Sequence, residues 1–116
     1  MFQLSTNPAT QTYLSTVRVE MPGDNGKKKI NEFKAKFKRL SQSELDDLSK
    51  RLQEKEVNDA GVINEVMVGW DGVKDENGND VEFSADNLAA LLDVHPVRPT
   101  LAKAFFESVY GAATKN

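Results

Sequence analysis

The segment VINEVMVGWDGVKDENGNDVEFSADNLAALLDV, residues 62–94, decides how the rest of the chain is arranged. Its first part places apolar residues at helical spacing, which predicts a nearly all-apolar helix over Val62–Trp70. The pattern breaks at Asp71-Gly72, where a polar stretch begins. A short helix with so few polar residues is expected to lie at the centre of the fold.

The second part of this segment predicts a turn and a further helix. Asn77-Gly78 suits the positive φ angles of a tight turn, which would pair Val73 with Val81. Ser84 is a favourable N-cap for a helix extending to Val94. The apolar face of that helix would carry Leu88, Leu91 and Leu92.

Before this segment, the chain predicts a β-hairpin over Thr12–Leu40. The turn signal is the sequence Pro22-Gly23-Asp24-Asn25-Gly26. Apolar side chains alternate with polar ones on both strands, which gives the hairpin one apolar and one basic face. The apolar face would hold Tyr13, Val17, Val19, Met21, Phe33, Ala35 and Phe37, and the basic face Lys34, Lys36 and Lys38.

Two more helices complete the predicted fold. Ser41 and Glu44 form a capping box for a helix reaching about Asp59, with Gly61 placed to end it. Thr100 would cap the last helix, after a break bracketed by Pro96 and Pro99. Its inward face would carry Leu101, Phe105, Val109 and Ala112.

These elements predict one α+β domain over residues 12–116, preceded by a flexible N-terminal arm over residues 1–11. The β-hairpin, residues 12–40, would pack on a small bundle of about four short helices in residues 41–113. A chain of 116 residues has the length of a single domain.

Composition excludes several classes of protein. There are no cysteines, so disulfides, Cys-based zinc sites and thiol catalysis are ruled out. No apolar run is long enough to span a membrane, and no signal peptide is recognisable, so no membrane partner is expected. The net charge of −3 hides a segregation: residues 1–40 carry eight Lys and Arg against three Asp and Glu, and residues 41–116 seven against fifteen. Such a chain can associate with copies of itself, or the two halves can neutralise each other within one fold.

The few candidate chemical groups lack the partners that chemistry needs. His95, the single histidine, precedes a proline and has no accompanying nucleophile motif, so a turn residue is the better interpretation. Asp75, Asn77 and Asn79 alternate like calcium ligands, but Asp80 and Asp86 stand where such a loop requires Gly and Glu. We therefore expect no enzymatic activity, no metal and no cofactor.

The basic strand and the lone tryptophan are the stronger candidates for binding. Aromatic residues alternating with lysines are typical of surfaces that bind single-stranded nucleic acid. Here the phenylalanines lie on the face opposite Lys34, Lys36 and Lys38, so nucleic acid is the less favoured partner. Trp70 suits either a core anchor with its N–H paired or an interface residue, and the sequence leaves both open.

Three segments in this order resemble the small tail assembly chaperones of long-tailed bacteriophages. They are EFKAKFKRLSQSE (residues 32–44), VGWDGVKDENGNDVEFSADNLAALLD (residues 68–93) and AFFESV (residues 104–109). The most specific part extends from Trp70-Asp71-Gly72 through Phe83-Ser84 to Leu91-Leu92-Asp93. The resemblance covers roughly residues 17–110.

The resemblance implies a non-enzymatic helper made during infection. Such chaperones bind the tape measure protein, keep it soluble and help the tail tube protein polymerise around it. The expected location is the host cytoplasm, with absence from the mature virion. The family often also makes a longer product by ribosomal frameshifting. Apolar surface on the C-terminal helices would hold the client, through Trp70, Phe105, Phe106 and Tyr110.

Phe105 and Phe106 are adjacent on a helix and point about 100° apart, so only one of them can easily face the core. Phe106 pairs with Tyr110 on the flank away from Leu101, which makes this flank the better contact surface. Two other functions stay open: a nucleic-acid-binding accessory protein that uses the basic hairpin, and a structural tail completion subunit.

Overall fold

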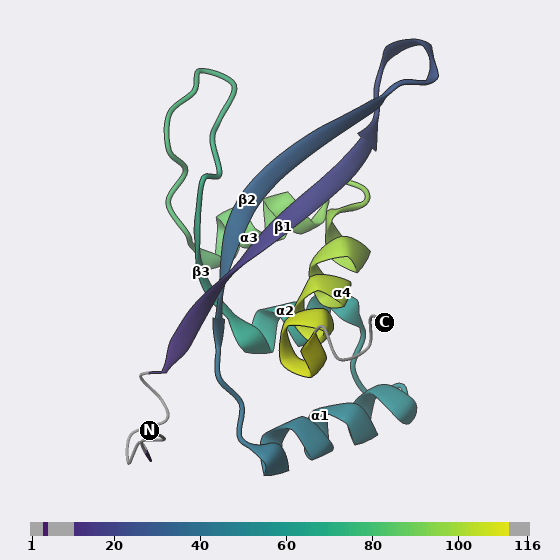
Figure 1. Ribbon diagram of the computed structural model, residues 1–116, viewed down its shortest axis with the longest axis vertical. Helices are drawn as coiled ribbons and strands as arrows, with labels where there is room; N and C mark the ends of the chain where they lie inside the picture. Colours follow the sequence, from purple (N-terminus) through teal and green to yellow (C-terminus); the bar gives the residue numbers. More distant parts are fainter. Residues whose placement is uncertain (1–3, 5–10, 112–116) are drawn as a thin grey trace.

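The computed structural model describes Leu4 and residues 11–111. Most of the arm predicted over residues 1–11, and Ala112 of the predicted last helix, lie outside these residues. Figure 1 shows a sheet with the helices gathered on one side of it. In chain order the elements are β1 (Thr12–Pro22), the short 3₁₀ turn η2 (Asp24–Gly26), β2 (Lys28–Lys38), α1 (Gln42–Gln53), α2 (Asp59–Val66), β3 (Met67–Asp71), α3 (Ala85–Leu92) and α4 (Val97–Tyr110).

The predicted β-hairpin is confirmed. Strands β1 and β2 pair antiparallel from Thr12 opposite Lys38 to Pro22 opposite Lys28. At its turn, Asn25 has a φ of 58° and Gly26 a φ of 76°, a region that asparagine and glycine enter at low cost. The hairpin extends well beyond the helices, and its turn forms one end of the molecule (Figure 1).

The helix predicted over Val62–Trp70 is wrong in its second half. Helix α2 ends at Val66, and Met67–Asp71 forms β3, the third strand of an antiparallel sheet with the order β1-β2-β3. A short apolar run fits a buried strand as well as a buried helix, so periodicity could not separate them. Gly69 has low helix propensity, and a Cβ there would lie only 3.3 Å from Lys36 Cδ across the strands.

The helix after the hairpin begins as predicted and ends earlier. The Ser41 side chain accepts a hydrogen bond from the Glu44 backbone N–H at 3.1 Å, and the Glu44 side chain accepts one from Ser41 N–H at 2.8 Å. The helix ends at Gln53 rather than near Asp59, and Lys55 then takes a φ of 61°. The chain reverses there in a left-handed conformation, which the sequence did not signal.

The residue predicted to end that helix instead lies inside the next one. Gly61 belongs to the first turn of α2, and the Asn58 side chain caps this helix by accepting a hydrogen bond from Gly61 N–H at 2.9 Å. Arg51 of α1 donates two hydrogen bonds to the Glu65 carboxylate of α2, at 2.8 and 3.0 Å. Helix α1 buries only Leu48 completely, Leu45 and Leu52 are partly buried against the core, and this bidentate pair adds a contact with α2.

The last two helices are present, but α3 ends at Leu92 rather than Val94 and α4 begins earlier than predicted. Ser84 caps α3 as expected, accepting a hydrogen bond from Asn87 N–H at 3.1 Å. Val81 N–H bonds to the Val73 carbonyl at 2.9 Å, which confirms the predicted small hairpin. Helix α4 begins at Val97, so Thr100 is not its cap. Pro99 is tolerated in the first turn because the N–H it lacks would have no partner within the helix.

The core lies on one face of the sheet. Phe37 is fully buried at its centre, with ring centroids 5.2 Å from Phe105 of α4 and 5.9 Å from Tyr13 of β1. The buried apolar residues come from all three strands and all four helices: Val17, Val19, Phe33, Ala35, Phe37, Leu48, Val62, Ile63, Val66, Met67, Leu88, Leu92, Val97, Leu101, Ala102 and Phe105. This arrangement confirms the predicted α+β class.

No described residue covers the opposite face of the long hairpin. On the long hairpin the residues between the buried ones are exposed, including Leu14, Thr16, Lys34 and Lys36. A sheet buried on one face gives this alternation along each strand. Over Leu4 and residues 11–111, no helix is long and apolar enough to cross a membrane.

Phe37→Ala is expected to lower the free energy of unfolding by about 3–5 kcal/mol, because it removes a fully buried ring that contacts two others. Lys34→Ala on the open face of the same strand should cost less than about 0.5 kcal/mol. Urea denaturation followed by circular dichroism measures both. Equal midpoints for the two variants would contradict the one-sided core.

Candidate functional site

The basic face of the hairpin carries free cations but no aromatic rings. Lys34 and Lys36 are exposed and Lys38 is half-buried. None of the three takes part in the ion pairs of the described residues. Phe33 and Phe37 are buried on the other face, as the strand alternation predicted. Bases therefore have no ring to stack on beside these lysines, and the face offers charge alone.

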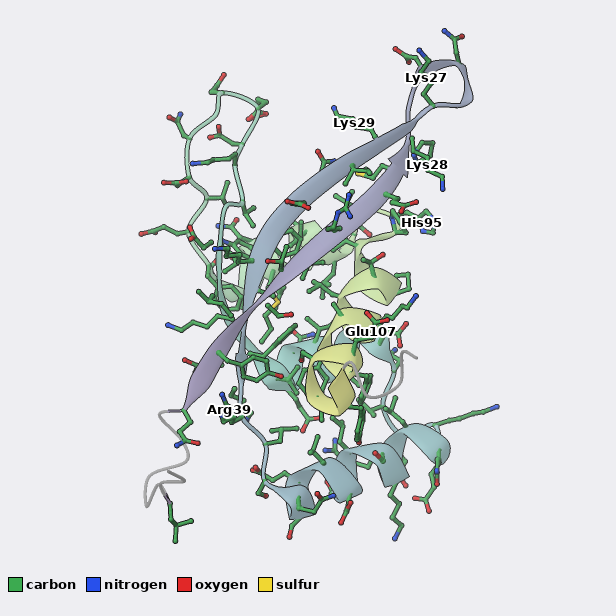
Figure 2. All side chains as sticks on the ribbon, viewed as in Figure 1. Lys27, Lys28, Lys29, Arg39, His95 and Glu107 are labelled. Atoms are coloured by element: carbon green, nitrogen blue, oxygen red, sulfur yellow. The ribbon has the colours of Figure 1, made fainter. Side chains whose placement is uncertain are left out.

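Further cations lie at the two ends of the hairpin. Figure 2 shows Lys27, Lys28 and Lys29 at the hairpin turn, with Arg39 at the opposite end. The Arg39 guanidinium carbon lies 5.1 Å from the centroid of the Tyr13 ring, which is within the range of a cation–π contact. Positive charge thus extends along the whole length of the hairpin.

Trp70 anchors the segment that returns from β3. Its indole N–H donates a hydrogen bond to the Val81 carbonyl at 2.7 Å, and its ring meets Phe83 edge-on at a centroid distance of 5.0 Å. The side chain is half-buried and its polar atom is satisfied. These contacts match the core-anchor interpretation of Trp70, and they hold the loop between β3 and α3 against the sheet.

The three aromatic residues of α4 have different environments. Phe105 is fully buried against Phe37 and has no exposed surface for a partner. Phe106 is half-buried and Tyr110 is 50% exposed, and their rings stack almost parallel with centroids 6.4 Å apart. The structure therefore leaves Phe106 and Tyr110, the flank preferred from helical geometry, as the aromatic surface of α4.

A groove that the sequence did not reveal lies between the hairpin, α3 and the loop after β3. It has a volume of about 450 Å³. Its apolar lining consists of Val19, Met21, Phe33, Gly72, Val73, Leu91, Val94 and Val97, with Asn31, Glu32 and Lys74 as polar neighbours. Val94 is 41% exposed, although it immediately follows an apolar helix face. Only the tertiary arrangement brings these separate segments together.

Two features shape the wall of this groove. Gly72 has a φ of 89°, which favours glycine, and this conformation turns the chain away from the sheet after β3. At the rim, the side chain of Lys74 donates a hydrogen bond to Asp80, and this bond raises the pKa of Lys74. Lys74 therefore stays protonated and supplies a charged edge beside the apolar surface.

The candidate chemical groups found in the sequence are turn residues in the structure. Asp75 accepts hydrogen bonds on one carboxylate oxygen from the backbone N–H groups of Asn77 and Asn79, at 2.9 and 3.0 Å. His95 is exposed in the turn before α4. Within the part of the chain that the structure describes, no group of three His, Asp or Glu side chains could hold a metal ion.

Together these features define a small α+β protein with an uncovered basic sheet face and a charged-rimmed apolar groove. Residues 22–116 match the model of the YdaY prophage protein family, and the chain belongs to that family. It is therefore a phage-derived protein. No curated protein and no solved structure matches the chain.

Trp70→Phe is expected to lower the free energy of unfolding by about 1–3 kcal/mol, because it leaves the Val81 carbonyl without its donor. Tyr110→Phe, which alters an exposed ring on α4, should change it by less than about 0.5 kcal/mol. Thermal and urea denaturation of both variants provide the comparison. A Trp70→Phe protein as stable as the wild type would remove the anchoring role.

Proposed function

We propose that this phage protein is a tail assembly chaperone, which binds the tape measure protein and promotes polymerisation of the tail tube protein around it. The resemblance of residues 32–44, 68–93 and 104–109 to such chaperones supports the proposal, as does membership of a prophage family. The observation that carries it is the apolar groove between the hairpin, α3 and the loop after β3.

The groove suits a helical client. A tape measure protein is a long amphipathic helix, and its apolar stripe needs cover until the tail tube surrounds it. Helix-in-groove recognition places apolar side chains of one helix face into a hydrophobic groove with polar edges. A groove of about 450 Å³, with Val73 and Val94 on its walls and Lys74 at its rim, can accept side chains from such a stripe.

The lining of the groove is held in place by the core. Val19, Phe33 and Val97 are nearly fully buried and belong to the same cluster as Phe37. A binding surface supported by packed elements needs little reorganisation when the client arrives, which reduces the entropic cost of binding. The stacked Phe106–Tyr110 pair on α4 gives a second apolar contact surface.

The proposed role is non-enzymatic and requires no cofactor. It places the protein in the host cytoplasm during assembly and outside the mature virion. Immunoblotting of purified virions tests this location. Stoichiometric presence in virions would favour a structural tail completion subunit instead.

Val94→Glu is expected to abolish co-purification with the tape measure protein and to leave that client in the insoluble fraction after co-expression. The substitution puts a charge into the groove, where the client would have to desolvate it. Val68→Glu on β3 is the matched control, because Val68 is 43% exposed, nearly equal to Val94 at 41%, and lies outside the groove. The control should retain the client.

The double variant Phe106→Ser with Tyr110→Ser distinguishes the two apolar surfaces. Loss of the client in this variant, with Val94→Glu still binding, would move the contact to α4 and contradict the groove assignment. Capture of the client by both variants would contradict binding through apolar surface altogether. Circular dichroism of each variant confirms that it is folded.

Nucleic-acid binding is the second candidate function, favoured by the unpaired lysines of the open sheet face. Binding of that kind weakens steeply with salt, because neutralised phosphates release counterions. Lys34→Ala and Lys36→Ala should then each reduce the slope of log DNA affinity against log salt concentration by about one, the effect of losing one phosphate contact. A protein without measurable DNA affinity at low salt excludes this function.

A further inference from the structure

Among the described residues, no strand pairs with the outer edge of β1. Within residues 11–111, β1 has a neighbouring strand only on the side of β2. Two backbone bonds flank their ladder, from Gly23 N–H to the Lys27 carbonyl at 2.6 Å and from Arg39 N–H to the Gln11 carbonyl at 3.1 Å. Hydrogen-bonded pairs alternate along antiparallel strands, so the odd-numbered residues of β1 bond to β2. The even-numbered ones, from Thr12 to Glu20, direct their N–H and C=O groups outward.

Among the described residues, the first half of this edge lacks the features that normally protect a free strand. Its first half, Thr12–Val17 (TYLSTV), carries no charge and is rich in residues that favour strands. Leu14 is 55% exposed beside the outward backbone groups. Proteins commonly prevent an edge strand from pairing with another chain by placing charged residues or proline on it, or by covering it with another segment. Arg18, Glu20 and Pro22 meet this description, but they lie in the second half of the strand, and Pro22 stops strand pairing only beyond Glu20.

A groove of about 550 Å³ follows this edge, between β1 and α4. Its lining residues are Thr16, Val17, Arg18, Glu20, Pro96, Thr100, Lys103, Ala104 and Glu107. Figure 2 shows Glu107 on α4, and Glu107 lines this groove together with residues of β1. Lys103 and Glu107 are both exposed, and neither belongs to an ion pair of the described residues.

The charges of this groove are balanced. Arg18 and Lys103 are positive, whereas Glu20 and Glu107 are negative. A groove built for an anionic or cationic partner would carry mainly one sign. Strand β1 and helix α4 each contribute one basic and one acidic residue. Such a balance suits a surface that contacts the same surface of a second copy. An interface with a two-fold axis requires this self-complementarity, because the same surface of both copies is in contact: where residue i of one copy contacts residue j of the other, j of the first also contacts i of the second.

We propose that β1 pairs antiparallel with β1 of a second copy of this chain, across a two-fold axis near Thr16 to Arg18. The outward N–H and C=O groups of both edges then bond to each other, and the two sheets become one continuous sheet. The same axis sets the two α4 helices antiparallel. Lys103 of each copy then faces Glu107 of the other.

The proposed dimer leaves the client groove open. The residues that line the groove along β1 and α4 have no member in common with those that line the groove beside α3. The exposed ion pairs Arg18–Glu32 and Lys28–Glu20 lie within one copy and need not break. Dimerisation therefore stands independently of the tape measure proposal, and either can fail without the other.

Charge exchange on α4 tests the proposal. Sedimentation equilibrium of the full chain should show a dimer. Lys103→Glu and Glu107→Lys should each raise the dimer Kd by about tenfold or more, because each sets like charges opposite each other twice across the axis. The variant carrying both substitutions restores opposite charges and should recover the wild-type Kd. Val94→Glu serves as the control and should dimerise normally.

A backbone substitution tests the strand pairing separately. Thr16→Pro removes an outward N–H and no bond to β2, so the protein should stay folded and become monomeric. If the wild-type protein is still monomeric at about 100 μM, its dimer Kd is far weaker than micromolar, and the proposal is overturned. A dimer whose Kd is unaffected by the single charge exchanges would also overturn it. Should Thr16→Pro unfold the chain, the charge-exchange series alone decides.

Discussion

The packing of Phe37 against Phe105 is the contact on which the rest of the structure depends. Phe37 lies near the end of the central strand β2, and Phe105 lies within the last helix α4. Both are fully buried, and their rings meet edge-on at a centroid distance of 5.2 Å. This contact joins the N-terminal hairpin to the last helix. The intervening helices α2 and α3 fill the space around it with apolar side chains.

A three-stranded sheet with helices on only one side has one apolar face, which packs against the helices, and one polar face, which is open to solvent. Every second residue of the hairpin enters the core, so every other one faces solvent, and the lysines are concentrated there. Grooves lined by apolar side chains then form at the margins of the helical layer. Both the groove beside α3 and the stacked Phe106–Tyr110 pair lie at such margins. A charged face and an apolar groove therefore follow from the same one-sided architecture.

The elements that local chemistry specifies could be predicted from the sequence. Strand alternation in β1 and β2, the Ser41–Glu44 capping box and the Ser84 cap are each encoded within a few neighbouring residues. The sequence pattern predicts helix over Met67–Trp70 because the strand that pairs with this segment, β2, lies thirty or more residues earlier in the chain. The groove beside α3 was missed for the same reason. Its lining comes from segments that only the tertiary fold assembles.

The candidate aromatic site was partly predictable. Helical geometry separated Phe105 from Phe106, and burial confirms that Phe105 is the one facing the core. The role of Trp70 could not be decided in advance, since its hydrogen-bond acceptor, the Val81 carbonyl, becomes available only after the intervening loop folds back. Residues whose role depends on a distant backbone group carry no local signature.

Helix α1 has few fully buried contacts with the rest of the molecule, so it should unfold locally at a lower free energy than the sheet. This helix contributes one fully buried side chain, Leu48, and the Arg51–Glu65 pair joins it to α2 at an exposed site. Elements with few buried contacts open at a lower free energy than the global unfolding of a domain. Helix α1 can therefore fray as a unit while the Phe37–Phe105 centre stays intact. We therefore expect the backbone amides of α1 to exchange with solvent earlier than those of β2.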